Sequence, residues 1–280
     1  MNIKVKLPPD FQFSQGSLQD FVDCRQRFFL RYIRRLAWPA IETEPVLENE
    51  HWMQQGALFH RLVQQAQLGV PAARLLTYIL GEELERWWDN FKTCCAPLIN
   101  QAEGHFVELS LNTALGLNRI TAKFDLVLRS ASGQATIFDW KTSAKHPQRQ
   151  WLEHRLQTIV YPWLLVQAGS SLNQGTPFLP EQIEMVYWFT DYPQEPERFP
   201  YDQAHYAADT RYLVELAETI HTLPESGFTL TSDKRKCRYC IYRSLCDRGV
   251  QAGDINDIEN GEQDDLSLSV DFDQVEEIPL

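Results

Sequence analysis

Apolar residues recur at helical spacing in the first third of the chain. They do so from Ser17 to Leu36, from His51 to Gly69 and from Pro71 to Phe91. We expect the first helix to begin with a capping serine, to break near Cys24 and to turn its arginines outward. Gly69 is expected to end the second helix and Pro71 to open the third. The pattern predicts three helices before residue 100.

The pattern changes to strands after residue 104. Residues 104–115 alternate apolar and polar side chains, and residues 119–129 and 134–141 form a hairpin around the turn SASG. A helical stretch over residues 147–168 and an apolar run over residues 183–189 then complete a strand-helix-strand crossover. A last helix is expected from Asp202 to Leu223. The sequence therefore predicts an α/β fold, with a mixed central sheet flanked by helices.

Each strand of the hairpin carries one acid among apolar residues. Asp139 and Lys141, two residues apart, share one face of their strand. Asp125 shares its face with Thr121, Lys123 and Val127. The opposite face of that strand is apolar and comprises Ile120, Ala122, Phe124, Leu126 and Leu128. The hairpin can bring Asp125 beside Asp139, and two adjacent carboxylates repel unless a cation or a proton lies between them. Oxygen ligands beside a lysine suit Mg²⁺ or Mn²⁺ and a phosphate. A solvated Asp-Lys pair on an exposed strand is the alternative interpretation.

Two helices contribute further polar candidates. Gln157 and Tyr161 lie four residues apart, on one face of the crossover helix, whose first turns follow the strand that ends at Lys141. Pro162 should kink that helix after Tyr161. His60 lies on the second helix between Phe59 and Leu62. Taken singly, Tyr161 and His60 are better explained as core residues and Gln157 as a surface residue.

The distribution of charge matters more than its total. The 280 residues carry a net charge of −12, but residues 250–280 contain ten acids and no Lys or Arg, so residues 1–249 are close to neutral at −2. We expect an acidic, disordered tail over residues 250–280. Two basic runs stand out, at residues 25–35 and 234–238. No apolar run is long enough for a membrane span and no signal sequence is recognised, so we expect a cytoplasmic protein.

Six cysteines without an export signal argue against a disulfide framework. Cys237, Cys240 and Cys246 form C-x2-C-x5-C near the C-terminus, whereas Cys24 stands alone near the N-terminus. Cys94 and Cys95 are adjacent, a poor arrangement for chelating one ion, and are expected to be core residues.

The ordered motifs together resemble a known family. They are Gly56 to His60, Asp125, Asp139 to Lys141, and Gln157 to Tyr161, and this order resembles the RecB-type branch of the PD-(D/E)xK nucleases. The cysteine pattern is similar to the iron-sulfur members of that branch, the AddB nuclease domain and the CRISPR-associated RecB-like exonucleases. The resemblance covers roughly residues 14–248. Asp139 stands where many members have Glu.

The resemblance implies specific roles. His60, Asp125, Asp139 and the main-chain carbonyl of Trp140 would bind Mg²⁺ or Mn²⁺, with Glu108 as a weaker candidate. Lys141 would position or deprotonate the attacking water, and Gln157 and Tyr161 would hold the lysine or the nucleic-acid strand. A 4Fe-4S cluster would be held by four thiolates, those of Cys24, Cys237, Cys240 and Cys246. Zinc is the competing metal for these four cysteines.

The implied protein is a nuclease over residues 1–249 with a restriction-endonuclease-like fold. Residues 14–50 and 224–248 would form the iron-sulfur region, a staple between the two ends of the chain, and residues 51–223 the nuclease core. We expect a metal-dependent DNA exonuclease acting on single strands in repair, recombination or CRISPR adaptation. The alternative is a catalytically silent iron-sulfur scaffold that binds DNA for a helicase or integrase partner. No G-x4-G-K-[ST] motif is present, so any unwinding must come from a partner.

Overall fold

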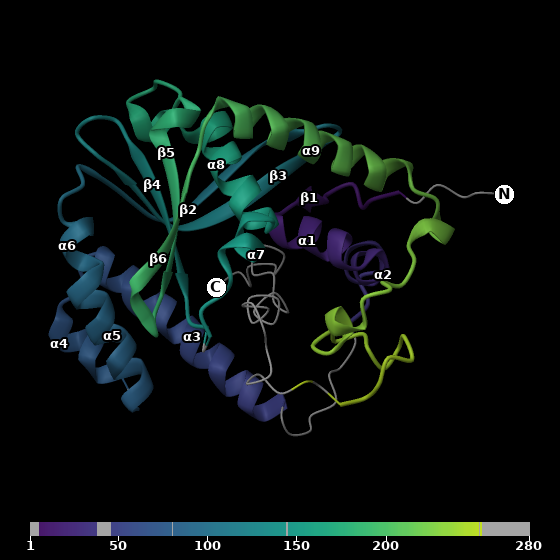
Figure 1. Cartoon of the computed structure of the whole chain (residues 1–280), viewed down its shortest axis with the longest axis horizontal. Helices are drawn as coiled ribbons and strands as arrows, with labels where there is room; N and C mark the ends of the chain where they lie inside the picture. Colours follow the sequence, from purple (N-terminus) through teal and green to yellow (C-terminus); the bar gives the residue numbers. More distant parts are fainter. Residues whose placement is uncertain (1–5, 38–45, 80, 144, 252, 254–280) are drawn as a thin grey trace, which may run out of the picture.

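A six-stranded mixed sheet forms the centre of the computed structural model (Figure 1). The structure describes residues 6–37, 46–79, 81–143, 145–251 and 253. Its strands are β1 (Gln12–Phe13), β2 (Gly104–Leu115), β3 (Asn118–Arg129), β4 (Ala135–Lys141), β5 (Ile183–Phe189) and β6 (Tyr192–Pro200). The sheet order is β1-β3-β4-β5-β6, and β2 also pairs with β3. The predicted mixed sheet flanked by helices is confirmed.

The longer helices occur in the same regions of the sequence as the predicted helices. The helical segments are α1 (Gln15–Asp23), α2 (Arg25–Phe28), the π-helical turn η1 (Phe29–Ile33), α3 (Val46–Gln67), α4 (Ala72–Leu75), η2 (Leu76–Tyr78), α5 (Glu82–Cys94), α6 (Ala96–Ile99), α7 (Arg149–Glu153), α8 (Leu156–Ala168), η3 (Gly169–Asn173), η4 (Pro180–Gln182), α9 (Gln203–Thr222), η5 (Glu225–Gly227) and η6 (Lys234–Cys237). None of the described helices is long and apolar enough to cross a membrane.

Two apolar clusters cover the two faces of the sheet. On one face, α1, α8 and α9 pack against side chains such as Ile137 and Tyr187. On the other face, α3 and α5 pack through Phe59, Trp87 and Phe91 against Trp140. Strand β4 alternates between these clusters, because Ile137 points to the α8 side and Phe138 and Trp140 point to the α3 side. Asp139 and Lys141 therefore lie on the α8 face.

The connections match the predicted crossover. Strands β3 and β4 pair antiparallel, and β4 and β5 pair parallel over their whole length, with α7 and α8 between them. The parallel β4-α8-β5 unit is thus confirmed. It brings the start of α8 to the carboxyl end of β4, where Lys141 lies.

Three predicted helices are interrupted. The first breaks at Cys24, as expected, where the backbone is extended, but its cap is Ser14, which forms a reciprocal capping box with Ser17. The third is wrong as a single helix, because Gly81 has a φ of +95° and separates α4 and η2 from α5. The helix expected over residues 147–168 is two helices, with His154 ending α7.

Strand β6 was not predicted. Its sequence YPQEPERFP contains prolines and charges and lacks an apolar run, but its edge position in the sheet tolerates both. The two-residue strand β1 is too short for a periodic signal. The acidic tail expected at residues 250–280 lies almost wholly outside the described residues, which end at Val250, Gln251 and Gly253.

The two ends of the described chain lie side by side (Figure 1). The amide of Gln26 donates to the carbonyl of Thr229 at 3.1 Å, and the Tyr242 hydroxyl donates to the carbonyl of Leu36 at 2.9 Å. The ammonium group of Lys236 lies 3.1 Å from a carboxylate oxygen of Asp23. These contacts join α1, α2 and η1 to residues 224–251, the two segments that we assigned to one region.

Candidate active site

Strands β3 and β4 separate at Asp125. Their register ends with Leu126 opposite Phe138, so residues 121–125 of β3 have no partner in β4. Side chains bind main-chain groups at this separation: the Asp125 carboxylate accepts from the amide of Trp140 at 2.9 Å, and the Tyr161 hydroxyl donates to the carbonyl of Lys123 at 2.8 Å. The separation thus places an acid from one strand beside the next strand.

The facing of β3 also changes at this point. Ile120, Ala122 and Phe124 pack in the α8 cluster, but Leu126 and Leu128 pack in the α3 cluster and Val127 joins the α8 cluster. The prediction of one uninterrupted apolar face from Ile120 to Leu128 was therefore wrong. The reversal falls at Asp125, opposite Glu108 of β2, whose φ is +50°. An irregular backbone, invisible to a period-two pattern, sets the direction of Asp125.

Asp139, Lys141 and Gln157 form a closed set of contacts. The Lys141 ammonium lies 2.8 Å from Asp139 Oδ2 and donates to Gln157 Oε1 at 3.0 Å. The Gln157 amide donates to Asp139 Oδ1 at 2.5 Å. Asp139 and Lys141 are only 4% and 7% exposed, so this charge pair is held in a largely dry environment. Helix α8 therefore orients both charged groups of β4.

His60 approaches the same carboxylates from the opposite layer. Its Nδ1 lies 3.4 Å from Asp125 Oδ1. Gly56, one helical turn earlier, allows this approach, because a Cβ there would meet the Thr142 hydroxyl oxygen at 2.8 Å. In the Gly-x3-His motif, Gly56 thus permits a close contact of α3 with the end of β4, and His60 directs its imidazole at Asp125.

The electrostatics show that the site favours positive charge. Burial by itself would lower the pKa of His60, but the carboxylates of Asp125 and Asp139 outweigh it and raise that pKa to about 9. Burial raises the pKa of Asp125, whereas His60 and the amide of Trp140 lower it, with a net decrease. His60 is thus protonated, and its positive charge balances part of the negative charge of the neighbouring carboxylates.

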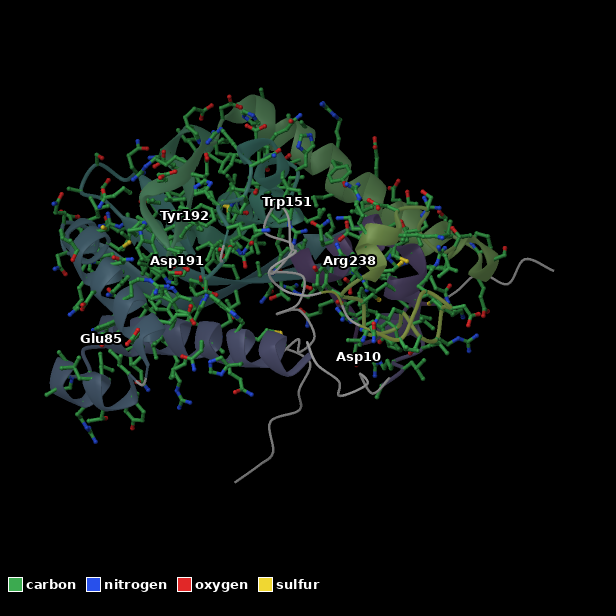
Figure 2. The ribbon with its side chains drawn as sticks, turned by 60° about the horizontal axis from the view of Figure 1, so that its bottom comes forward. Asp10, Glu85, Trp151, Asp191, Tyr192 and Arg238 are labelled. Atoms are coloured by element: carbon green, nitrogen blue, oxygen red, sulfur yellow. The ribbon has the colours of Figure 1, made fainter. Side chains whose placement is uncertain are left out.

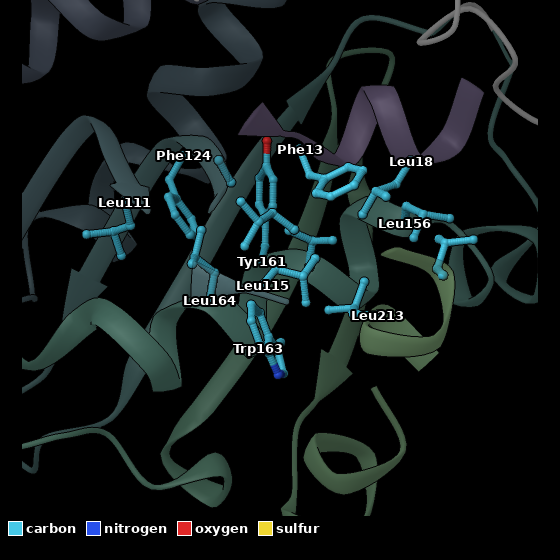
Figure 3. Close-up of a cluster of buried hydrophobic side chains, with 14 of the residues drawn as sticks. Phe13, Leu18, Leu111, Leu115, Phe124, Leu156, Tyr161, Trp163, Leu164 and Leu213 are labelled. Carbon is cyan, nitrogen blue, oxygen red and sulfur yellow. The ribbon is translucent and has the colours of Figure 1, made fainter. Parts of the chain in front are cut away.

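Tyr161 lies between the apolar cluster and the polar site. Its ring packs against Phe124 with centroids 4.7 Å apart, and its hydroxyl points away from Leu115 and Trp163 (Figure 3). Burial, followed by Asp139 and Asp125, raises its pKa well above the usual value. It therefore stays protonated and donates to the carbonyl of Lys123. The ring is a core group, and the hydroxyl binds the main chain of β3.

Glu108 is engaged elsewhere. Its carboxylate lies 2.6 Å from the ammonium of Lys123, although its main chain is opposite Asp125. In this arrangement the expected weak metal ligand instead fixes the outer side of β3. The sequence gives no sign of this pairing, because it depends on the local backbone reversal.

The four widely spaced cysteines line one pocket. Cys24, Cys237, Cys240 and Cys246 share it with Arg27, Lys236, Arg243 and Arg248. Burial raises the pKa of Cys246 to about 11, and the other three cysteines add to the rise. All six cysteines are free thiols, and Cys95 is buried among apolar side chains, as expected. Cys94, expected in the core, is half-buried at its edge.

Within the described ranges, no three His, Cys, Asp or Glu side chains are already placed to hold a metal ion. The donor chemistry nevertheless fits the two expected groups. Oxygen and imidazole ligands converge from β3, β4 and α3, with a proton and an ammonium group balancing their charge. Thiol ligands gather from both ends of the chain around a separate pocket.

Two of the arginines near Cys24, Arg27 and Arg31, do not face solvent, whereas Arg25, Arg34 and Arg35 are exposed, as expected. Arg27 lies 2.7 Å from Asp20 and 3.1 Å from Asp23, and Arg31 lies 2.8 Å from Asp20, so the expectation that these arginines face solvent was wrong. The i,i+4 spacing of Asp23 and Arg27 was an available signal. Phe28, Tyr32 and Tyr242 are also buried, so these aromatic residues near the basic runs belong to the core. Exposed basic residues lie on both segments: Arg25, Arg34 and Arg35 near Cys24, and Lys234, Arg235 and Arg238 near Cys237.

Comparison with known proteins decides the family. A family model for the PD-(D/E)XK nuclease superfamily matches residues 12–247, most of the chain. The chain belongs to the PD-(D/E)XK nuclease superfamily. No curated protein sequence matched the chain.

Two solved structures are similar to parts of the chain. A crystal structure of the protein SSO0001 is 17% identical, covers 86% of this chain and 88% of its own, and has a TM-score of 0.40. A crystal structure of an exonuclease candidate from Eubacterium rectale is 8% identical, covers 75% of this chain and 79% of its own, and has a TM-score of 0.47. Both scores lie below 0.5, so neither likeness adds to the superfamily assignment.

Proposed function

We propose that this PD-(D/E)XK nuclease is a Mg²⁺- or Mn²⁺-dependent exonuclease that hydrolyses single-stranded DNA. The observation that carries the proposal is the convergence of His60, Asp125, Asp139 and Lys141 at the separation of β3 and β4. Asp125, Asp139, His60 and the carbonyl of Trp140 would hold the ion. A bound divalent ion lowers the pKa of a water molecule and polarises the scissile phosphate.

The protein groups have separate roles in this proposal. The Lys141 ammonium, held by Gln157, would orient the attacking water and stabilise negative charge developing on the phosphate. Tyr161 fixes β3 through the carbonyl of Lys123 and so keeps Asp125 in place. His60 gives up its proton when it becomes a ligand, because a protonated imidazole has no free lone pair.

The cysteine pocket supports the narrower assignment to the iron-sulfur, RecB-like branch. Cys24, Cys237, Cys240 and Cys246 would hold a 4Fe-4S cluster as a structural staple between the ends of the chain. Iron and sulfide analysis of protein prepared without oxygen tests this, with zinc as the competing result. Brown colour and broad visible absorption are expected for the cluster.

The single-strand preference rests on the exposed basic residues Arg25, Lys234 and Arg238, with Tyr239 beside Arg238 for stacking. In Figure 2, Arg238 is labelled well away from Glu85 of α5. Oligonucleotides blocked at the 5′ or 3′ end distinguish an exonuclease from an enzyme that cuts internally. Cleavage of a circular single strand would contradict the exonuclease assignment.

The catalytic assignment is tested by release of nucleotides from end-labelled DNA with added Mg²⁺ or Mn²⁺. Asp139→Asn and Lys141→Ala should each reduce the rate at least about a hundredfold, because each removes a charge used in the transition state. Asp209→Asn is a matched control, since its carboxylate accepts from Tyr201 outside the site. Equal activity in wild type and both site variants would contradict the assignment.

The same assay distinguishes the exonuclease from the alternative function, a catalytically inactive DNA-binding scaffold for a helicase or integrase. The alternative predicts DNA binding with no metal-dependent release of nucleotides by the wild type. The contacts between Asp139, Lys141 and Gln157 support the enzyme, because they hold in place the acid and the ammonium group that catalysis would use.

A further inference from the structure

Arg243 is a buried cation in the wall of the cysteine pocket. It is 5% exposed, and it lies midway between Cys240 and Cys246 in the sequence C-x2-C-x2-R-x2-C. Its guanidinium donates to the carbonyl of Cys240 at 3.1 Å and twice to the carbonyl of Val250, at 3.0 and 3.2 Å. Its hydrogen-bond donors are therefore directed at main-chain oxygens.

The other cations of the pocket differ from Arg243 in their partners. Arg27 pairs with Asp20 and Asp23, and Lys236 pairs with Asp23. Arg248 is half-exposed and donates to the carbonyl of Thr231 at 3.4 Å. In the described part of the chain, no carboxylate forms an ion pair with Arg243. Carbonyl dipoles satisfy its hydrogen bonds but leave a full charge without a counter-charge, which is costly in a buried position.

The thiols in the same pocket can supply that counter-charge. Neutral thiols carry none, but four thiolates around zinc or a 4Fe-4S core outweigh the positive charge of the metal and leave a net anion. Cys240, the neighbour whose carbonyl Arg243 already binds, belongs to this set. The nearby buried ion pairs also have a surplus of cations, because Arg27, Arg31 and Lys236 share Asp20 and Asp23.

We propose that Arg243 is the internal counter-cation of the thiolate-bound metal group, and that its charge sets how firmly the group is retained and how readily it is reduced. This inference rests on the proposed metal group at Cys24, Cys237, Cys240 and Cys246. Arg243 is a positioning residue, since it acts through the ligands and the loop between Cys240 and Val250. The segment around Cys240 and Cys246 would thus supply cysteine ligands and also, through Arg243, the positive charge that balances the metal group.

Two variants separate charge from hydrogen bonding. Arg243→Gln keeps N–H donors for the carbonyls of Cys240 and Val250 but removes the charge. Arg243→Lys keeps the charge but loses the planar fork that bridges the two carbonyls. Arg248→Gln is the matched control, because it removes a charge from the same pocket at a more solvated position.

The measurements are metal content, the rate of metal release to a chelator, and a redox titration of the iron form. Arg243→Gln should release metal at least tenfold faster than wild type. Without the cation the reduced, more negative group is less stable, so the reduction equilibrium should move about tenfold toward the oxidised form, or ~59 mV for one electron. Arg243→Lys should stay within about threefold of wild type, and Arg248→Gln should change less than Arg243→Gln.

Equal metal-release rates and reduction potentials for Arg243→Gln and wild type would overturn the inference. Equally fast metal release from Arg243→Gln and Arg243→Lys would also overturn it, because that result indicates a purely structural bridge. If Arg243→Gln is not recovered folded, the lysine variant decides: release near the wild-type rate supports a counter-charge, and rapid release overturns it. Wild-type protein that binds neither iron nor zinc overturns the proposed metal group itself, and this result is obtained before any variant is made.

Discussion

The imidazole of His60 links the candidate active site to pH. Its pKa in the folded chain is about 9, above the ordinary value of 6.5, because the carboxylates of Asp125 and Asp139 stabilise the charged form. A group whose pKa is higher in the folded state stabilises the fold fully below its unfolded pKa. That contribution is lost as the pH rises from about 6.5 through about 9.

We therefore predict that His60→Asn destabilises the metal-free protein at pH 6 but not at pH 10. One third of the side chain is exposed, so solvent screening limits the effect to about 1–2 kcal/mol. Urea unfolding at several pH values measures it. In an Asp125→Asn background the pH-dependent difference should shrink, since the main counter-charge is gone. A constant effect of His60→Asn across this range would contradict the assigned pairing.

Glu108 stores backbone strain beside the site. Its φ of +50° is unfavourable for any residue with a Cβ. Glu108→Gly and Glu108→Ala both remove the ion pair with Lys123, but only glycine relieves the strain. We predict that Glu108→Gly is about 1 kcal/mol more stable than Glu108→Ala in urea unfolding. At Ser110, a regular position of the same strand, the order should reverse, because glycine costs about 0.5–1 kcal/mol there. The same order at both positions would argue against strain at Glu108.

At the scale of elements, the approach of α3 to β4 depends on a missing side chain. A Cβ on Gly56 would lie 2.8 Å from the Thr142 hydroxyl oxygen. We predict that Gly56→Ala costs about 1–3 kcal/mol in unfolding free energy and lowers nuclease activity, because α3 must move away and carry His60 from Asp125.

A double mutant tests this reason directly. Thr142→Ala removes the clashing oxygen, and alanine is favoured over glycine inside a helix by about 1 kcal/mol. In the Thr142→Ala background, Gly56→Ala should therefore be neutral or stabilising. If Gly56→Ala is equally destabilising in both backgrounds, the contact with Thr142 is not the cause.

The periodic elements explain why the facing of several candidate site residues was predictable. The side chains of His60, Asp139, Lys141, Gln157 and Tyr161 lie on regular helices or strands, where spacing alone decides which share a face. Features that depend on tertiary contacts were missed. The charged edge strand β6 and the pairing of Arg31 with Asp20, eleven residues away, contradict the local pattern. Local periodicity carries no information on such partners.

At the scale of the molecule, the site joins the two layers around the sheet. His60 comes from α3 in one apolar cluster, whereas Gln157 and Tyr161 come from α8, which packs in the other. Asp125 and Asp139 lie between them, at the point where β3 and β4 separate. Relative movement of the layers changes ligand distances directly, so the packing of both clusters determines the geometry available for catalysis.

The two ends of the chain form a second junction, whose strength depends on the proposed metal group. Without it, the junction relies on contacts such as Gln26 with Thr229, Tyr242 with Leu36, and Lys236 with Asp23. We predict that Cys246→Ser speeds amide hydrogen exchange across residues 15–36 and 224–250. Exchange in β3 and β4 should not change, because their apolar clusters remain.

Cys94→Ser is the matched control, because Cys94 lies on α5 outside the cysteine pocket and interacts with Gln194. It should leave exchange at both ends of the chain unchanged. Faster exchange throughout the sheet in Cys246→Ser would mean that the junction supports the whole fold. Unchanged exchange at both ends in Cys246→Ser would mean that the direct contacts alone hold the junction together. That result argues against a structural staple, because removing one of four thiolate ligands must weaken the junction that they hold.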